Sequence, residues 1–328
     1  MVKVSVIIPV YNGSKHIHGC VSVINMQTHS DLDVIFVVDS KTTDDTIDRI
    51  ISETSGDPRF RVIMQNDDQR MGGARNIGFD AALGDYIWFL DVDDHPYPTL
   101  IEEVVDIAER ESSPVVFFNS IYSSDWDLPE KEYGRYSVKV MSPVEALFEV
   151  GRGGLSLCPW SRVYRTGFLR ENSIRFIAGY CEDFKQTVDS LLVADKVVYY
   201  NKPLYVYYQH GSSLCGGSND DSIAQRDVEL SGEMCESFRE RFPDDYERFC
   251  GHLFRHVIRS LTRASPEKFR ELSKSEGMRK LASHKSPEIS MDVLIYRVSP
   301  AMFYRIGNYA RNRKYSMKSD VLFDGNLS

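Results

Sequence analysis

Short apolar runs alternate with helical patterns up to about residue 120, and this alternation limits the chain to a small set of folds. Runs of four to eight β-branched and aromatic residues predict strands, whereas apolar residues three or four positions apart predict helices. Since the runs are apolar on both faces, we predict a mostly parallel α/β sheet covered by helices on both sides. The predicted strands are Val4–Pro9, Leu32–Val38, Phe60–Met64, Tyr86–Leu90 and Pro114–Asn119. The helical stripes are Ile17, Val21 and Ile24; Ile47, Ile50 and Ile51; Ile77 and Ala81; and Leu100, Val104, Ile107 and Ala108.

The alternation ends near residue 120, where "SSDWDLPEKEYGRYS" predicts a loop. "SPVE", from Ser142 to Glu145, then predicts the start of a helix with proline at its first position. A further helix is expected from Glu182, with a strand at "KVVYYN" after it. From about residue 222 the pattern is helical and more charged. We therefore predict a sheet domain over residues 1–221 and a mainly helical region over residues 222–328.

Charge and cysteine usage exclude several classes of protein. A net charge of −9 offers no basic surface for nucleic acid, so we expect no nucleic-acid partner. The six cysteines have no regular spacing, which favours a reduced protein over a disulfide scaffold or a zinc site. With no apolar run of about twenty residues, no transmembrane helix is expected. We expect a cytoplasmic protein that could also contact the inner face of the plasma membrane.

Three aspartates follow the predicted strand in "DYIWFLDVDDHPYP", namely Asp91, Asp93 and Asp94. Like charges at this spacing repel one another, so solvent, a basic side chain or a cation must compensate them. If the chain stays extended, Asp91 and Asp93 point the same way, and carboxylates that also meet a substrate diphosphate suit Mg²⁺ or Mn²⁺. The alternative is a solvated turn in which Asp94 caps the next helix.

Other polar residues follow predicted strands or begin predicted helices. Ligands of open α/β sheets bind beyond the carboxyl ends of the strands, where Pro9, Tyr11, Asn12 and Asp39 should lie. Neither a G-x-G-x-x-G turn after the first strand nor a P-loop occurs. The glycines of "RMGGARN" could admit an anion that Arg75 would pair with, or form an ordinary turn.

Two further motifs allow both a structural and a functional interpretation. Glu182 and Asp183 of "GYCEDF" stand at a helix N-terminus, where the helix dipole favours acids, or one of them acts as a general base. Cys181 beside them fits a buried thiol better than a nucleophile. His210 in "YYQHGSS" is either a packed or surface residue, or a ligand to a metal or phosphate.

The order of these blocks carries more information than each block alone. "VSVIIPVYNG", "DVIFVVDSKTTDDT", "GGARNIGFDAALGDYIWFLDVDD", "EDF" and "YYQHGSS" together resemble the family 2 glycosyltransferases of the GT-A fold. "WSRVYRTGFLRENSIRFIAGYCEDF" is similar to the bacterial capsule and exopolysaccharide branch. The resemblance covers roughly residues 3–215. It implies an inverting, metal-dependent hexosyl- or N-acetylhexosaminyltransferase that uses Mn²⁺ or Mg²⁺ and a nucleotide-sugar donor, usually a UDP-sugar. The acceptor would be a saccharide or lipid-linked hydroxyl in cell-surface polysaccharide or glycolipid synthesis.

The resemblance also implies residue roles. Asp183 would be the catalytic base, with Glu182 as a supporting acid. Asp91 and Asp93 match the DxD motif, with Asp91 towards the ribose and Asp93, with His210 near the diphosphate, towards the metal. The nucleotide-sugar contacts would be Pro9, Tyr11, Asn12, Asp39, Arg75, Asp91 and Val92. The usual "DDGSTD" is "DSKTTD" here, with Ser40 and Lys41 replacing aspartate and glycine. Nucleotide binding is therefore implied more strongly than a preference for uridine.

Two other classes share some of these features. A sugar nucleotidyltransferase would have metal carboxylates on a similar sheet, but it should carry a glycine-rich basic loop after the first strand, which "PVYNGSKH" matches poorly. A non-catalytic nucleotide-binding protein would keep the strand ends without needing Asp183.

The segment from Val293 to Lys318 contains six basic residues and no acidic one, interleaved with aliphatic and aromatic residues. A basic amphipathic segment can lie on an anionic membrane surface. The alternative is that its apolar residues pack on the rest of the protein and its arginines form a solvated edge.

Overall fold

The computed structural model describes residues 2–66, 70–123, 135–208, 220–285 and 291–316, with side chains of the last segment described to residue 309. The chain divides into two compact units, one of residues 1–143 and 157–216 and one of residues 144–156 and 217–328. The sequence placed a boundary after residue 221; the structural division falls after Gly216 and also assigns Val144–Ser156 to the helical unit.

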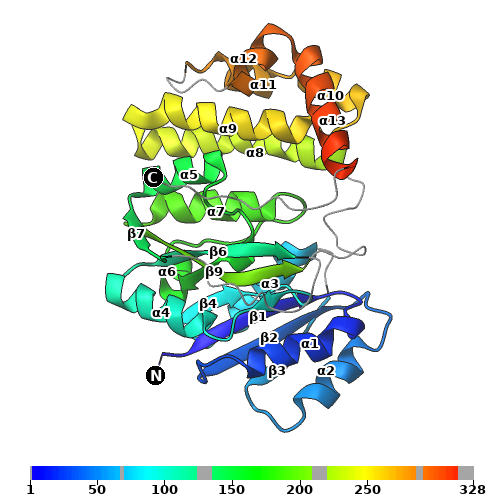
Figure 1. Cartoon of the computed structure of the whole chain (residues 1–328), viewed down its shortest axis with the longest axis vertical. Coiled ribbons are helices and arrows are strands. Elements are labelled where there is room, and N and C mark those ends of the chain that lie inside the picture. The colour runs from blue at the N-terminus through cyan, green and yellow to red at the C-terminus, as the bar shows by residue number, and fades with distance from the viewer. Residues whose placement is uncertain (1, 67–69, 124–134, 209–219, 286–290, 317–328) are drawn as a thin grey trace. The chain divides into compact units, whose positions relative to one another are not determined.

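The first unit is built on a nine-stranded mixed sheet in the order β3-β2-β1-β4-β8-β6-β9-β5, with β7 paired to β9 (Figure 1). Strands β3, β2, β1 and β4 are parallel neighbours, and β6 and β9 run in the same direction. The predicted mostly parallel α/β sheet is confirmed. The strands are β1 (Val4–Val10), β2 (Leu32–Asp39), β3 (Phe60–Gln65), β4 (Tyr86–Phe89), β5 (His95–Pro96), β6 (Val115–Ser123), β7 (Val138–Met141), β8 (Arg162–Arg165) and β9 (Val197–Tyr208).

Helices follow the strands much as the apolar stripes predict. In α1 and α4 the predicted residues are buried, and α7 begins at Glu182 with the expected apolar face inward. The helices of this unit are α1 (Ser14–Asn25), α2 (Thr46–Thr54), α3 (Arg70–Ala81), α4 (Leu100–Glu111), α6 (Thr166–Glu171) and α7 (Glu182–Val193).

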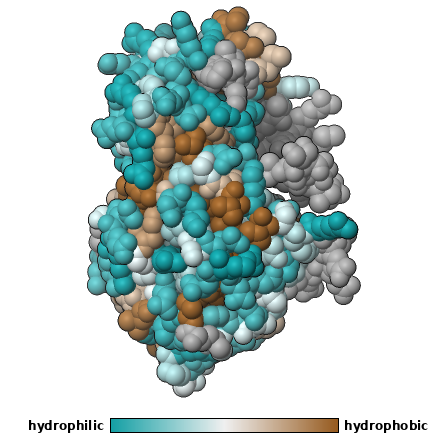
Figure 2. Space-filling model, turned by 90° about the vertical axis from the view of Figure 1, so that its left-hand side faces the viewer, coloured by the Kyte–Doolittle hydropathy of each residue, from teal (hydrophilic) through white to brown (hydrophobic). Residues whose placement is uncertain are grey.

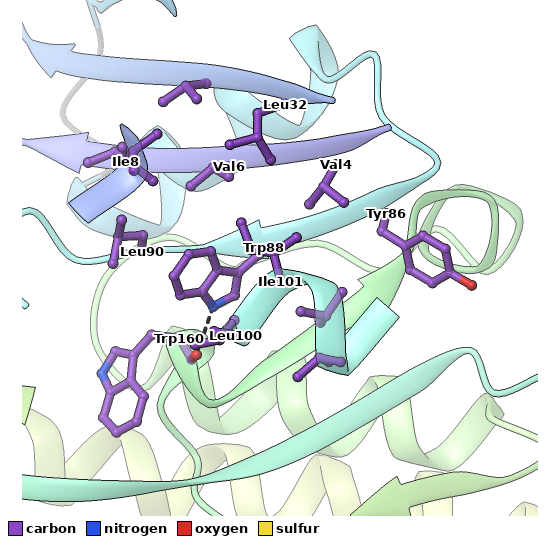
Figure 3. Close-up of a cluster of buried hydrophobic side chains, with 14 of the residues drawn as sticks. Val4, Val6, Ile8, Leu32, Tyr86, Trp88, Leu90, Leu100, Ile101 and Trp160 are labelled. Carbon is purple, nitrogen blue, oxygen red and sulfur yellow. Dashed lines mark hydrogen bonds between the residues drawn. The ribbon is translucent and has the colours of Figure 1, made fainter. Parts of the chain in front are cut away.

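The main core lies on one face of the sheet, where even-numbered β1 side chains meet α1 and α4 (Figure 3). Successive strand residues point to opposite faces, so Val4, Val6 and Ile8 share this face, and all three are fully buried there. Trp88 from β4 adds a large indole whose Nε1–H donates to the Trp160 carbonyl at 2.9 Å, so its polar atom is satisfied inside the core. Burial of each such side chain stabilises the fold by about 1.5–3 kcal/mol.

The opposite face of β1 contacts α3; the helix predicted from Ile77 and Ala81 is present, but its buried face is formed by other residues. Ile77 and Ala81 are only partly buried; the buried positions of α3 are Gly72, Gly73, Ala74, Arg75, Gly78 and Phe79. A Cβ on Gly78 would stand 2.3 Å from Ile7 Cγ2, so only glycine lets the helix lie this close to the strand. The apolar stripe misled because glycines, not large side chains, form the contact face.

Strand β3 also differs from its prediction as a strand buried on both faces. Val62 and Met64 are exposed because β3 lies at the edge of the sheet, where β2 is its one partner among the described strands. Strand β8, which the apolar runs did not predict, lies antiparallel between β4 and β6.

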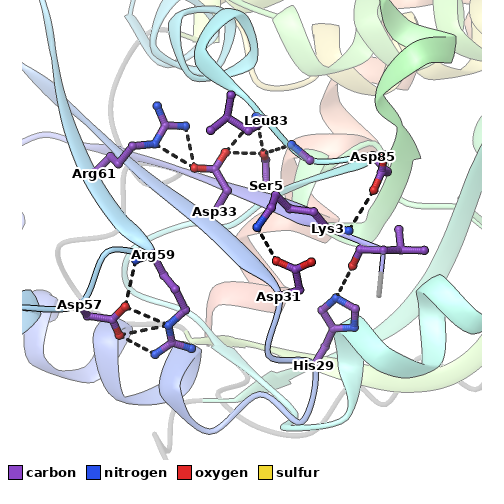
Figure 4. Close-up of polar contacts among 12 residues, drawn as sticks. Lys3, Ser5, His29, Asp31, Asp33, Asp57, Arg59, Arg61, Leu83 and Asp85 are labelled. Atoms are coloured by element: carbon purple, nitrogen blue, oxygen red, sulfur yellow. Dashed lines mark hydrogen bonds and ion pairs between the residues drawn. The ribbon is translucent and has the colours of Figure 1, made fainter.

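A network of hydrogen bonds lies at the amino ends of the parallel strands (Figure 4). Asp33, buried in β2, accepts hydrogen bonds from Ser5 Oγ at 2.7 Å and from Arg61 Nε at 2.9 Å. The Leu83 N–H also donates to Asp33, at 3.0 Å, and the Gly84 N–H donates to Ser5 Oγ. The buried carboxylate therefore has donors on both oxygens, one of them cationic.

The second unit is helical. The predicted start at Pro143 is confirmed, and α5 packs within this unit through Phe148, whose ring lies 5.1 Å from His252 and 4.0 Å from the Arg248 guanidinium. Phe238 and Phe249 stack at 4.0 Å between α8 and α9. The helices are α5 (Pro143–Arg152), α8 (Asp220–Arg241), α9 (Tyr246–Leu261), α10 (Pro266–Leu272), α11 (Glu276–Ser283), α12 (Met291–Val298) and α13 (Pro300–Ser316). Across the described ranges, none of the helices combines the length and apolarity needed to cross a bilayer.

Candidate active site at the carboxyl ends of the parallel strands

The chain segments that follow β1 and β2 are held together by side-chain to backbone hydrogen bonds. Asn12, in a left-handed conformation, accepts the Thr43 N–H on its amide oxygen at 2.8 Å. The Gly13 N–H donates to Thr46 Oγ1 at 3.0 Å. Asn12 therefore shapes this edge of the sheet by holding the loop after β2.

The other residues predicted to hold a nucleotide lie along the same edge with different exposures. Tyr11 is 54% exposed, whereas Pro9 is buried within β1 opposite Val37. Asp39 is partly buried, and its Oδ1 accepts the Lys41 N–H at 2.8 Å. Val92 lies beside Gly13, which brings the end of β4 next to the end of β1. Tyr11 and Asn12 are thus exposed, Asp39 and Val92 are partly buried, and Pro9 is the buried member of this group.

Arg75 is a buried cation that joins three separate elements. It is 3% exposed; its NH2 group donates to Asp91 Oδ1 at 3.3 Å and its NH1 group to Glu182 Oε1 at 3.2 Å. The guanidinium lies over the Phe176 ring at 5.4 Å, and its Nε has no hydrogen-bond partner among the described residues. Arg75 thereby brings Glu182, which is 107 residues away in sequence, to the carboxylates after β4.

Among the described residues, Asp91 and Glu182 share the Arg75 guanidinium, and the Asp183 carboxylate acts electrostatically on both acids. Burial raises the pKa of Asp91, and the nearby Asp93 and Asp183 carboxylates raise it further against the opposing effect of Arg75. Burial also raises the pKa of Glu182, with Asp183 adding to that effect. The edge therefore favours binding of additional positive charge.

Asp94 does not cap a helix, so that alternative was wrong. It is 1% exposed and accepts the Tyr205 hydroxyl at 2.6 Å and the Tyr208 N–H at 2.9 Å. Burial and the Asp91 carboxylate raise the pKa of Asp94 to about 9. Helix α4 instead starts after Thr99. Asp94 connects the carboxylate turn to the end of β9, a role that sequence reasoning missed because Tyr205 and Tyr208 are more than a hundred residues away.

The glycine-containing start of α3 contacts the chain before α7. A Cβ on Gly72 would stand 2.7 Å from the Ile177 carbonyl oxygen and 3.1 Å from Glu182 Cγ. Asn76 holds the same segment, since its Nδ2 donates to the Phe176 carbonyl at 2.8 Å and its Oδ1 accepts the Phe176 N–H at 3.0 Å. Sequence reasoning missed Asn76, although its place beside Arg75 in "GGARN" was a usable signal. Gly72 and Asn76 together position Glu182.

Asp183 occupies the first turn of α7 and is partly exposed. Its Oδ1 accepts the Phe184 N–H at 2.8 Å, and the helix begins after Cys181, which has a left-handed backbone. The carboxylate is close enough to Asp91 to influence its pKa, so the two predicted functional acids lie in one site. Asp183 thus combines a fixed position with access to solvent.

These residues fit a divalent cation that a substrate also binds. Carboxylate oxygens are hard ligands that Mg²⁺ and Mn²⁺ prefer, and Mg²⁺ commonly uses one or two of them together with phosphates. Within the described ranges, no three His, Cys, Asp or Glu side chains form a group that could hold a metal by themselves. His210, the remaining predicted ligand, lies outside the described residues.

The fold is similar to that of solved glycosyltransferase structures. Staphylococcus aureus TarS 1-349, in complex with UDP-GlcNAc, superposes with a TM-score of 0.69 at 16% identity, over 95% of this chain and 92% of TarS. The mannosyltransferase PcManGT of Pyrobaculum calidifontis, in complex with GDP-Man and Mn²⁺, has a TM-score of 0.54 at 14% identity, over 96% and 88% of the two chains. At these identities the likeness establishes the fold.

Sequence comparison establishes the family. The uncharacterized glycosyltransferase YibD of Escherichia coli is 30% identical over 226 residues, which are 65% of this chain and 63% of YibD. The sequence model of Glycosyl transferase family 2 matches residues 5–171, a region that contains Arg75 and the three aspartates after β4. The chain belongs to glycosyl transferase family 2.

Proposed function

We propose that this protein transfers a sugar from a nucleotide-sugar donor to an acceptor hydroxyl with inversion at the anomeric carbon. The observation that carries the proposal is the sharing of the buried Arg75 guanidinium between Asp91 and Glu182 at the carboxyl ends of the parallel strands, where burial and neighbouring carboxylates raise the pKa of both acids. Such a cluster of acids suits a site that also binds a cation and its diphosphate ligand. Family membership supports the same reaction class.

The donor nucleotide would bind across the ends of β1 and β2. Tyr11 offers an exposed ring on which a base can stack, and Asp39 lies one strand away. TarS holds UDP-GlcNAc and PcManGT holds GDP-Man, so this fold serves both uridine and guanosine donors. We propose a UDP-sugar, hexosyl or N-acetylhexosaminyl, with Ser40 and Lys41 as the positions that modify base selection.

A divalent cation, Mn²⁺ or Mg²⁺, would be held by Asp93 with Asp91 and His210. When bound, it supplies positive charge that neutralises the departing diphosphate. PcManGT, which shares the fold, was solved with Mn²⁺. Arg75 would hold the Asp91 carboxylate in place for this role through its hydrogen bond.

Asp183 would accept the proton of the attacking hydroxyl. The acceptor oxygen forms a bond to the anomeric carbon while the bond between that carbon and the diphosphate oxygen breaks, and the proton moves to the Asp183 carboxylate. General-base assistance of this kind is worth about 10²–10⁴-fold in rate. Glu182, fixed by Arg75, would orient the acceptor beside it.

The acceptor would be a saccharide or lipid-linked hydroxyl in cell-surface polysaccharide or glycolipid synthesis. The resemblance to the capsule and exopolysaccharide branch around "GYCEDF" supports this class.

The test is release of free nucleoside diphosphate from a panel of UDP- and GDP-sugars, with Mn²⁺, Mg²⁺ or excess chelator. We expect release with one donor class, loss in chelator, and loss in Asp93→Ala. Asp31→Ala, which removes a partly exposed acid at the other end of the strands, is the matched control and should retain activity. Consumption of added pyrophosphate, with formation of nucleoside triphosphate and sugar 1-phosphate, would instead indicate a nucleotidyltransferase, and nucleotide binding without turnover would indicate a binding protein. Full activity in chelator or in Asp93→Ala would reject the metal site.

A further inference from the structure

The C-terminal helices α12 and α13 use only part of their apolar surface for packing. Val293, Tyr296 and Phe303 are buried. The Tyr296 ring lies edge-on to Phe254 at 5.4 Å, and the Tyr304 hydroxyl donates to the Ala264 carbonyl at 2.7 Å. The predicted alternative, in which this segment packs on the rest of the protein, therefore holds for one face of the two helices.

Each of the two helices also exposes large apolar side chains at helical spacing. These residues, named together the α12–α13 stripe, are Met291, Leu294 and Val298 on α12 and Met302, Ile306 and Tyr309 on α13. Val298 is 85% exposed and Met291 69%. Figure 2 shows the molecule from the side opposite to α13. Solvent-exposed apolar residues gathered in this way mark an interaction surface.

Positive charge accompanies the stripe. Arg305 is exposed on α13, whereas the guanidinium of Arg297 on α12 donates to the His284 carbonyl and lies over the Phe254 ring at 6.0 Å. The one acid of α12, Asp292, pairs with Arg255 at 3.4 Å and with Arg259 at 2.9 Å, so its charge is compensated. From residue 293 to residue 318 the sequence holds six basic residues and no acidic one, in a chain with a net charge of −9.

We propose that the α12–α13 stripe docks on an anionic membrane surface. An exposed apolar row beside basic residues can insert among acyl chains while the arginines meet anionic headgroups. A second copy of this chain is a poorer fit, because a two-fold contact through the stripe would bring basic residues against basic residues. The stripe would hold the protein at the membrane independently of donor chemistry.

The experiment is flotation of the full chain with phosphatidylcholine vesicles that contain or lack phosphatidylglycerol, at low and at high salt. We expect flotation with phosphatidylglycerol at low salt, and its loss without the anionic lipid or at high salt. Val298→Glu/Met302→Glu should abolish flotation. Leu83→Glu/Ile51→Glu, which changes two exposed apolar residues of the first unit, is the matched control and should float like the parent. Arg305→Ala should weaken partition about fivefold, as loss of one basic residue near the surface does.

Circular dichroism and the melting temperature must show that each variant is folded. A parent protein that stays in the soluble fraction at low salt overturns the proposal. So does concentration-dependent dimerisation that Val298→Glu/Met302→Glu abolishes while no variant floats, since a second copy would then cover the stripe. Nucleoside diphosphate release is measured on the same variants, so failure of docking and failure of the proposed transfer are separate outcomes.

Discussion

The two ends of the parallel strands both bury carboxylates beside arginine, yet the charges are balanced differently. At the amino ends, Asp33 has a hydrogen-bond donor on each oxygen and a cationic partner in Arg61 (Figure 4). At the carboxyl ends, Arg75 is shared between Asp91 and Glu182, with further carboxylates nearby that raise the pKa of both.

The way in which buried carboxylates are paired therefore distinguishes structural polar residues from functional ones, and this distinction does not depend on knowing the reaction. A buried charge whose partners are all supplied by the fold lowers the free energy of the folded chain in the absence of ligand. Acids whose pKa is raised by burial and by neighbouring carboxylates cost free energy in their charged form, and such groups cluster at binding and catalytic sites. The predictions below test whether the two ends respond as this comparison requires.

The largest effect is expected at the carboxyl end from Asp183→Asn. The amide keeps the shape of the side chain but cannot accept the proton, so turnover should fall about 10²–10⁴-fold while donor binding persists. Steady-state release of nucleoside diphosphate and thermal shift with the donor measure the two quantities. A rate within a few-fold of the parent would assign the base to Glu182 or another group.

At the amino end, Asp33→Ala should reduce stability instead. It leaves Ser5 and the Leu83 N–H without their acceptor and Arg61 without its carboxylate, a loss of about 2–4 kcal/mol. Urea denaturation measures the change, and turnover of the folded fraction should match the parent. Asp31→Ala, which removes a partly exposed partner of Lys3, is the control and should leave the midpoint nearly unchanged. An equal effect of both variants would remove the distinction between the buried network and the surface pair.

Substitutions of two glycines of α3 should have smaller effects, and they should differ in whether turnover is affected as well as stability. Gly78→Ala meets the Ile7 side chain in the core, whereas Gly72→Ala meets the Ile177 backbone in the segment before Glu182. Each should cost about 1–3 kcal/mol of stability through overpacking. Only Gly72→Ala should also reduce turnover, because it displaces Glu182. Denaturation midpoints and turnover numbers check this, and equal turnover in the two variants would mean that Glu182 needs no positioning.

The smallest effect concerns pH. Because the folded-state pKa of Asp94 is raised to about 9, its stabilising contribution is complete below its unfolded pKa and is lost as pH rises towards 9. The opposite holds for Asp57, since hydrogen bonds from Arg59 lower its pKa and its contribution is lost as pH falls.

Asp94→Asn removes the titrating group while an amide oxygen can still accept from Tyr205. In metal-free buffer, we compare the melting temperatures of Asp94→Asn and the parent. The difference between them should shift by about 2–4 °C in favour of the variant from neutral pH to pH 9. Parallel melting curves across this range would show that Asp94 does not titrate in the folded protein.

Much of the local structure was predictable because periodicity is a property of neighbouring residues. Continuous apolar runs located β1, β2 and β4, the period-3.6 pattern located α1, α4 and α7, and "LDVDD" placed the aspartates at the end of a buried strand. Turn chemistry and helix starts, such as Pro143, are likewise set within a few residues. The order of motifs was enough to identify the family before any contact was known.

Only the tertiary structure determined which residues far apart in sequence come into contact. No local pattern shows that Arg75 meets Glu182, that Asp94 meets Tyr205, or that Val144–Ser156 belongs to the helical unit. The buried face of α3 was also mispredicted, because packing through glycine depends on how close Ile7 lies rather than on hydrophobicity. A sequence states which charges and side chains are available, whereas burial and pKa depend on which of them the folded chain brings together.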